Sequence, residues 1–145
     1  MDKTGRALDA NLNRAGEGLR VLEDVARFLL DREDLTEELR SLRRELRREG
    51  EATIGWRVLI QERDTSGDVG LDGFVAGRRG LADLVAANAR RVQEACRVLE
   101  ELGAVATAGT QALAERARLT RYRLYALEVE LAAALEGIGQ KNGET

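Results

Sequence analysis

The residues of this chain that could do chemistry occur in two matching stretches. Residues 10–24 read ANLNRAGEGLRVLED and residues 87–101 read ANARRVQEACRVLEE, so that an offset of 77 makes eight of the fifteen columns identical. The identical columns hold an Asn, two Arg and two Glu besides the apolar positions. Repeated packing alone would preserve only the apolar columns. An Asn can hydrogen-bond a polar ligand and an Arg can hold an anion, so the pattern favours a polar site that is built twice.

Each copy places an Asn, an Arg and a Glu three residues apart, and these are Asn11, Arg14, Glu17, Asn88, Arg91 and Glu94; Arg20 and Arg97 follow them. Two interpretations stay open. Arg and Glu at this spacing form ion pairs along a helix, which predicts a salt-bridge ladder. Alternatively, the Asn lies beside the apolar stripe and lines a polar pocket inside the bundle, where the Arg holds an anion.

Besides the two repeated stretches, a third candidate for a functional site is the stretch RDTSGDVGLDG at residues 63–73, which is rich in Asp and Gly. It is either a simple turn or a phosphate or metal loop, since Gly lets backbone N–H groups approach an anion. In the second case Arg63 contacts a phosphoryl group, and Asp64 and Asp68 supply oxygen ligands to Mg²⁺. No P-loop motif occurs in the sequence.

The composition narrows the chemistry. The chain has 145 residues, no His, one Cys and a net charge of -3. Without His there is no imidazole base and no His metal site. A single Cys excludes an internal disulfide, and no signal or membrane segment is evident, so we expect a cytoplasmic protein. A nucleic-acid-binding domain is usually basic, so the slightly negative net charge makes a nucleic-acid partner unexpected.

The elements that must position these residues are helices. Proline is absent and aromatic residues make up only 3% of the chain, while apolar residues recur at alternating steps of four and three. The residues that this spacing predicts in the core are Leu8, Leu12, Ala15, Leu19, Leu22, Ala26 and Leu29 on helix one, Leu35, Leu39, Leu42 and Leu46 on helix two, Leu81, Val85, Ala89, Val92, Cys96 and Leu99 on helix three, and Leu113, Ala117, Leu124, Leu127 and Leu131 on helix four. Helix one is predicted to begin near Thr4, helix two to begin at a capping box near Asp34 and end at Gly50, helix three to run from about Gly77 to Gly103, and helix four to begin at Thr110. Residues 51–61 are predicted to form a short helix or turn over the end of the bundle.

The second helix repeats as well. At an offset of 78, helix two and helix four share five columns, among them Arg40/Arg118 and Arg43/Arg121. The repeating unit is therefore a helical hairpin, and two hairpins predict an all-α four-helix bundle with a pseudo-twofold axis. We expect one domain over residues 1–138, with repeat halves at about 4–50 and 78–136, a Gly/Asp-rich loop at 61–77 and a flexible tail at 139–145.

Four motifs in order give a family resemblance: ANLNRAxEGLRVLED, RDTxGDVG, ANxxRxxEAxRVLEE and RYRxYxLE, which span residues 10–128. Together they resemble the alternate hydroxymethylpyrimidine-phosphate kinase family of thiamine biosynthesis. That family occurs alone or fused in front of the barrel enzyme thiamine-phosphate synthase. The chain departs from the pattern at Ser66, where a Pro is expected.

The resemblance implies phosphoryl transfer from ATP, with Mg²⁺, to 4-amino-5-hydroxymethyl-2-methylpyrimidine phosphate. It would make Arg14, Arg63, Asp64, Asp68 and Arg91 catalytic, with Glu17, Asp64, Asp68 and Glu94 as metal ligands. The substrate would contact Asn11, Glu17, Arg20, Thr65, Asn88, Glu94, Arg97 and Arg121. The alternatives are a non-catalytic helical docking or regulatory module that partners thiamine-phosphate synthase, and a helical nucleotide-binding regulator. A homo-oligomer is left open.

Overall fold

The computed structural model describes residues 3–54, 79–106 and 108–143. Within these ranges the chain forms long helices and no strand. Helix α1 spans Lys3–Asp24 and continues as one π-helical turn, Val25–Leu29; α2 spans Glu33–Ile54; α4 spans Leu81–Ala106; and a 3-10 turn, Ala108–Thr110, leads into α5, Gln111–Gly143. The expected all-α bundle is confirmed. The expected loop at 61–77 lies outside the described residues.

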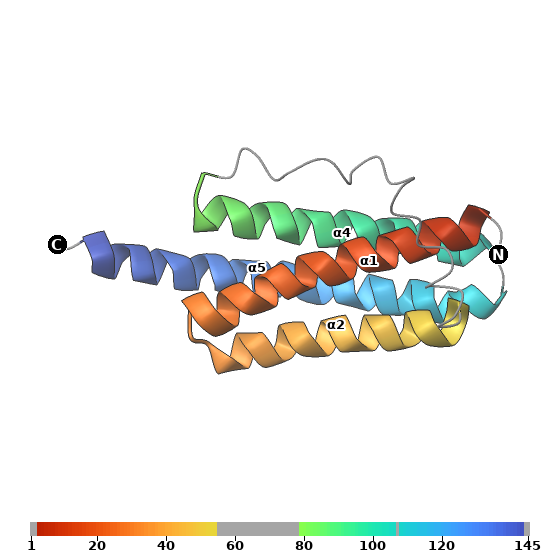
Figure 1. Cartoon of the computed structure of the whole chain (residues 1–145), viewed down its shortest axis with the longest axis horizontal. Helices are drawn as coiled ribbons and strands as arrows, with labels where there is room; N and C mark the ends of the chain where they lie inside the picture. Colours follow the sequence, from red (N-terminus) through yellow and green to blue (C-terminus); the bar gives the residue numbers. More distant parts are fainter. Residues whose placement is uncertain (1–2, 55–78, 107, 144–145) are drawn as a thin grey trace.

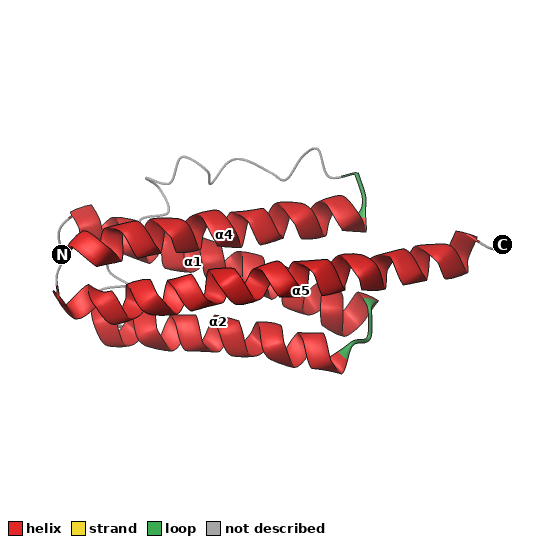
Figure 2. Cartoon of the chain, turned by 180° about the vertical axis from the view of Figure 1, so that it is seen from behind, coloured by secondary structure: helices red, strands yellow, loops and turns green. Residues whose placement is uncertain are grey.

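The two hairpins pack so that equivalent helices run in opposite directions (Figure 1). α1 packs on both α2 and α4, and α5 packs on both α4 and α2. The two copies of the repeated stretch, on α1 and α4, therefore meet antiparallel, as a pseudo-twofold arrangement requires. The last turns of α5 extend beyond the ends of the other helices in both views of the chain (Figures 1 and 2).

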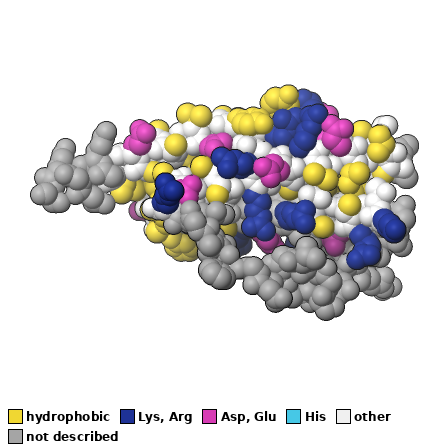
Figure 3. Space-filling view, turned by 90° about the horizontal axis from the view of Figure 1, so that it is seen from above, with side chains coloured by type: hydrophobic (Ala, Val, Ile, Leu, Met, Phe, Trp, Pro, Cys, Tyr) yellow, Lys and Arg dark blue, Asp and Glu magenta, His cyan; other side chains and the backbone are white. Residues whose placement is uncertain are grey.

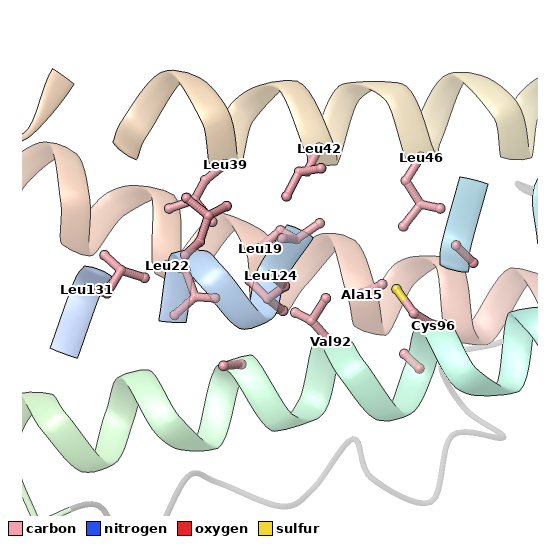
Figure 4. Close-up of a cluster of buried hydrophobic side chains, with 14 of the residues drawn as sticks. Ala15, Leu19, Leu22, Leu39, Leu42, Leu46, Val92, Cys96, Leu124 and Leu131 are labelled. Carbon is pink, nitrogen blue, oxygen red and sulfur yellow. The ribbon is translucent and has the colours of Figure 1, made fainter. Parts of the chain in front are cut away.

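One apolar core fills the space between the four helices (Figure 4). Every apolar position expected on helix four is fully buried, as are most of those expected on helices one to three. Each buried Leu adds about 2 kcal/mol of transfer free energy. The buried residues expected from the periodicity are Leu8, Ala15, Leu19, Leu22, Ala26, Leu35, Leu39, Leu42, Leu46, Val85, Ala89, Val92, Cys96, Leu99, Leu113, Ala117, Leu124, Leu127 and Leu131.

The π-helical turn changes which residues face the core at the end of α1. Leu29 was expected in the core but is 51% exposed, whereas Val25 is buried. A π turn contains one residue more than an α turn, so it rotates the residues after it by roughly 100°. The turn closes with the Leu30 N–H donating to the Val25 carbonyl at 2.9 Å. Asp31 then takes a positive φ of 54° and leads the chain into α2.

The helix ends differ from the sequence prediction at the glycines. α2 passes Gly50 and ends at Ile54, so the predicted stop at Gly50 is wrong. A Cβ at Gly50 would lie 2.6 Å from Leu12 Cδ1, so this glycine serves the close approach of α1 to α2. In the same way α4 passes Gly103, where a Cβ would lie 3.1 Å from the Thr110 carbonyl oxygen. α5 continues to Gly143.

Candidate functional site

The repeated stretches meet where α1 crosses α4, and Gly18 makes this crossing close. A Cβ at Gly18 would lie 2.6 Å from Val92 Cγ2 and 3.2 Å from the Asn88 carbonyl oxygen. Two carbon atoms in favourable contact are about 3.5–4.0 Å apart, so a larger residue would push the helices apart. The side chains of Ala15, Leu19 and Val92 are fully buried at this level, so the two helices are in direct contact there.

Four charged residues of the repeated stretches, Arg14, Glu17, Arg91 and Glu94, are exposed on the outside of the bundle. Arg91 Nη2 lies 3.7 Å from Glu17 Oε2, and the two side chains are 48% and 68% exposed. Basic and acidic side chains lie next to each other over much of the face shown in Figure 3. Exposed pairs of this kind contribute about 0–1 kcal/mol. The Arg91–Glu17 contact is therefore an exposed ion pair between α1 and α4.

The two repeated asparagines bind their own helices. The Asn11 side-chain amide donates to the Ala7 carbonyl at 2.9 Å, and the Asn88 amide donates to the Leu84 carbonyl at 2.9 Å. This bond to the residue four positions earlier is a local alternative for a polar side chain on a helix. The identical geometry in both copies explains why the amide can lie beside the core without costing an unsatisfied donor.

A second repeated pattern joins the two helices of each hairpin. In the first hairpin the Glu23 carboxylate accepts from Arg43 Nε at 2.9 Å and from Arg40 Nε at 3.4 Å, and its side chain is only 3% exposed. Arg40 also pairs with Glu37. Burial works to raise the pKa of Glu23, but the hydrogen bonds from Arg43 and Arg40 outweigh it and hold that pKa below its usual value.

The second hairpin repeats this contact with equivalent residues. The Glu100 carboxylate accepts from Arg121 Nε at 2.6 Å and from Arg121 Nη2 at 2.9 Å. Arg118, the equivalent of Arg40, pairs with Glu115 at 3.0 Å. The hydrogen bonds to Glu100 raise the pKa of the Arg121 guanidinium. The structure thus ties Arg121, expected at a substrate site, to a carboxylate that holds α4 on α5.

A partly open cavity of about 270 Å³ lies between α1 and α2. This volume lies just below the range of typical ligand pockets, which begins at about 300 Å³, so only a small molecule would fit in the cavity. Gly16 opens the space, since a Cβ placed there would meet no atom within 4 Å. The lining residues are Asp9, Leu12, Asn13, Gly16, Glu17, Arg20, Arg43, Leu46 and Arg47.

The cavity combines an apolar floor with a wall of both charges, in which the carboxylates Asp9 and Glu17 of α1 stand with basic side chains. Leu12 and Leu46 supply the apolar surface, while Arg43 and Arg47 come from α2. Arg43 uses its Nε–H for Glu23, and Arg47 uses its Nε–H for Glu51 at 3.1 Å. Their terminal NH₂ groups remain as further donors. An anion that can accept two hydrogen bonds side by side, such as a carboxylate or a phosphate, is the ligand that such donors recognise best.

The structure brings together only some of the residues expected at a site. Glu17 and Arg20 line the cavity, whereas Arg14 and Glu94 are exposed elsewhere and Arg97 pairs with Glu101 at 2.7 Å. The sequence analysis missed Asp9, Asn13, Arg43 and Arg47, although the Arg43/Arg121 column of the repeat marked one of them. Four expected residues lie outside the described residues, namely Arg63, Asp64, Thr65 and Asp68.

Neither a metal centre nor a membrane span is found in the part of the chain that the structure describes. There, no three His, Cys, Asp or Glu side chains are grouped so that they could hold a metal ion. Glu17, expected as a metal ligand, lies beside Arg91. Since Asp64 and Asp68 lie outside the described ranges, Mg²⁺ stays a prediction. None of the described helices is both long and apolar enough to cross a membrane.

Comparison with known proteins gives one family and a consistent set of relatives. The model of the ThiD2 family matches residues 6–130. A thiamine-phosphate synthase of Rhodopirellula baltica is 42% identical over 142 residues, which are 94% of this chain and 36% of that protein. A thiamine-phosphate synthase of a Synechocystis species is 42% identical over 128 residues, 85% of this chain and 34% of the relative. No solved structure matches the chain.

These relatives correct the expected reaction. The chain was expected to be an ATP-dependent kinase of a pyrimidine phosphate, yet the curated relatives are named thiamine-phosphate synthase. The relatives therefore support the link to thiamine biosynthesis, but they contradict the expected kinase activity. The chain spans little more than a third of the length of these relatives, so it corresponds to one part of such an enzyme.

Proposed function

Since the chain belongs to the ThiD2 family, we propose that it is a non-catalytic helical module that docks on thiamine-phosphate synthase and regulates it. One observation carries this proposal. Nearly the whole chain, 94% in one relative and 97% in another, matches a stretch that makes up 36% and 38% of a thiamine-phosphate synthase. A unit that occurs within such enzymes has a natural partner in the remainder of the enzyme.

The electrostatics of the bundle support a binding role over proton-transfer chemistry. Among the described residues, each carboxyl group whose pKa departs from its usual value is shifted down, which applies to Glu23, Asp34 and Glu115. A general base works best with a pKa near the operating pH, which for a carboxylate requires an upward shift. The described carboxylates with shifted pKa values are instead arranged as permanent anions in ion pairs.

The cavity between α1 and α2 supplies the place for a regulatory ligand. The ligand we propose is a small phosphate-bearing pyrimidine, whose ring contacts Leu12 and Leu46 while its phosphate accepts from Arg43 and Arg47. Arg47→Glu should then weaken binding of the pyrimidine phosphate at least tenfold, because a positive side chain that attracts the phosphate is replaced by a negative one that repels it. The neighbouring Arg44→Glu changes the same charge on the same helix outside the cavity and should leave the affinity unchanged.

The docking proposal is tested by the rate of the synthase. Increasing amounts of the chain are added to the thiamine-phosphate synthase encoded in the same genome, and thiamine phosphate formation is followed. We expect a change in rate that saturates with chain concentration. A rate that stays constant up to a large excess of the chain would contradict regulation, and the Arg44→Glu and Arg47→Glu variants then show whether the cavity binds its ligand independently.

A further inference from the structure

Helix α5 is apolar on two opposite sides. Its inner side carries the buried residues Leu113, Ala117, Leu124, Leu127 and Leu131. The outer side carries Tyr122, Tyr125, Ala126, Val129, Ala132 and Ala133, which are all exposed. Helices at the surface of a protein normally place polar residues on the outer side, whereas a helix that is apolar all round is covered on both sides. We call these six exposed residues the outer face of α5.

The repeat shows that packing within the bundle does not require this outer face. At the offset of 78, the equivalents of Tyr122, Tyr125, Ala126 and Val129 on α2 are Arg44, Arg47, Arg48 and Glu51. These four equivalent positions are thus charged on α2 and apolar on α5. On α5 the exposure is large, at 56% for Tyr122 and 69% for Val129. A contiguous apolar patch of this kind marks an interaction surface.

The outer face has a charge of opposite sign at each end. Arg118 precedes it and Glu136 follows it, and both are exposed. Their separation of 18 residues equals five helical turns, so the two side chains leave α5 on the same side and about 27 Å apart. Arg118 forms an exposed pair with Glu115 in which both side chains are about half exposed, 46% and 57%. Such a pair is weak and leaves Arg118 able to bind a second carboxylate.

We propose that the outer face of α5 binds the outer face of a second copy of this chain, with the two helices antiparallel. Around a twofold axis near residue 127, Arg118 of each copy lies against Glu136 of the other. The same register places Tyr125 against Val129 and Tyr122 against Ala132, so that large side chains meet smaller ones. A twofold contact must be self-complementary, and the arrangement of charge and size along α5 meets this condition.

The aromatic side chains at the centre of this face already contact each other and a neighbouring arginine in the single chain. The Tyr122 and Tyr125 rings meet edge to face, with centroids 6.3 Å apart. The Arg121 guanidinium lies 4.9 Å from the centre of the Tyr122 ring. Association therefore costs little side-chain entropy at these positions. The contact is only one helix wide, which places it at the small end of specific interfaces, so we expect a reversible dimer with a Kd of about 10 µM.

Sedimentation velocity over a range of chain concentrations tests the proposal without the synthase, so its result is independent of the proposed function. Wild-type chain should shift from monomer to dimer. Arg118→Glu and Glu136→Arg should each weaken the dimer about tenfold, since the twofold axis counts each charge change twice. The combined variant Arg118→Glu/Glu136→Arg should regain affinity to within about threefold of wild type, which loss of folding could not produce.

Two further variants complete the test. Tyr125→Glu puts a charge at the centre of the face and should abolish the dimer, while Arg44→Glu on the equivalent side of α2 should leave it unchanged; circular dichroism checks that both keep their helix content. Wild-type chain that stays monomeric up to about 200 µM, well above the expected Kd, would overturn the proposal. So would a dimer insensitive to Tyr125→Glu. Binding of the synthase that Tyr125→Glu abolishes in a monomeric chain would assign the face to the synthase and overturn self-association.

Discussion

The closeness of α1 to α4 is tested by two glycines that lie two residues apart on the same helix. Gly18 faces Val92 across the crossing, and an added Cβ would lie 2.6 Å from Val92 Cγ2. Gly16 faces the cavity, and an added Cβ would meet no atom within 4 Å. Replacing each by Ala makes the same chemical change in the same helix, so the two variants differ only in what surrounds the new methyl group.

The expected magnitudes follow from these surroundings. Ala is favoured over Gly inside a helix by about 1 kcal/mol, so Gly16→Ala should raise the free energy of unfolding by that amount. Gly18→Ala gains the same term, but overpacking of a well-packed contact costs about 1–3 kcal/mol. The net result is a loss of about 0–2 kcal/mol for Gly18→Ala. The two variants should therefore differ by about 1–3 kcal/mol.

Urea unfolding followed by circular dichroism at a helical wavelength measures both values, with unchanged m-values as evidence that the variants unfold in the same way. In thermal unfolding the difference corresponds to about 2–4 °C for each kcal/mol in a chain of this size. Equal stabilisation by Gly18→Ala and Gly16→Ala would mean that α1 and α4 are further apart than described. That result would refute the crossing on which the pseudo-twofold arrangement rests.

Three other predictions concern the ion pairs, the thiol and the first turn of α2. The pKa of Glu23 is lowered in the folded state, so its ion pair stabilises the fold above the unfolded pKa of about 4.3, and this stabilisation is lost as pH falls through the lowered pKa. Glu23→Gln should therefore lower the free energy of unfolding at pH 7. In strong acid, urea unfolding should show no difference between this variant and wild type. Burial raises the pKa of Cys96 to about 12, so a thiol reagent at pH 8 should modify it only after unfolding; rapid reaction of the folded chain would contradict its placement in the core. Hydrogen bonds from Arg32 hold the pKa of Asp34 at about 2, so Asp34 should still be ionised at pH 3. NMR titration of its carboxyl carbon measures this, and Arg32→Ala should raise the pKa of Asp34 towards 3.9.

The helical architecture could be read from the sequence because a period of 3.6 residues is a local property of the chain. The apolar steps of four and three placed Leu19, Leu22 and Leu124 in the core, where the structure has them. The π-helical turn at Val25–Leu29 could not be read in this way. The extra residue of this turn depends on how the first hairpin closes, not on the local apolar spacing. Leu29 therefore points outward although the spacing predicted it in the core.

The repeat pointed to the right columns but not to their roles. The repeated Glu and Arg columns suggested a ligand site, whereas the structure uses Glu23 with Arg43 and Glu100 with Arg121 to join helix pairs. These pairs join residues about twenty positions apart, which helical periodicity does not reveal. The cavity also escaped prediction, because it arises where Gly16 of α1 lies opposite Arg43 and Arg47 of α2. The family resemblance led to thiamine biosynthesis, but the reaction taken from it was wrong.

The most direct test of docking is calorimetric titration of the chain into the thiamine-phosphate synthase of the same genome, at two temperatures. We expect saturable heat at one or both temperatures and a heat that becomes more negative on warming, because burial of apolar surface gives a negative heat-capacity change. Heats equal to dilution at both temperatures, with both proteins folded and at concentrations well above the micromolar range, would contradict it.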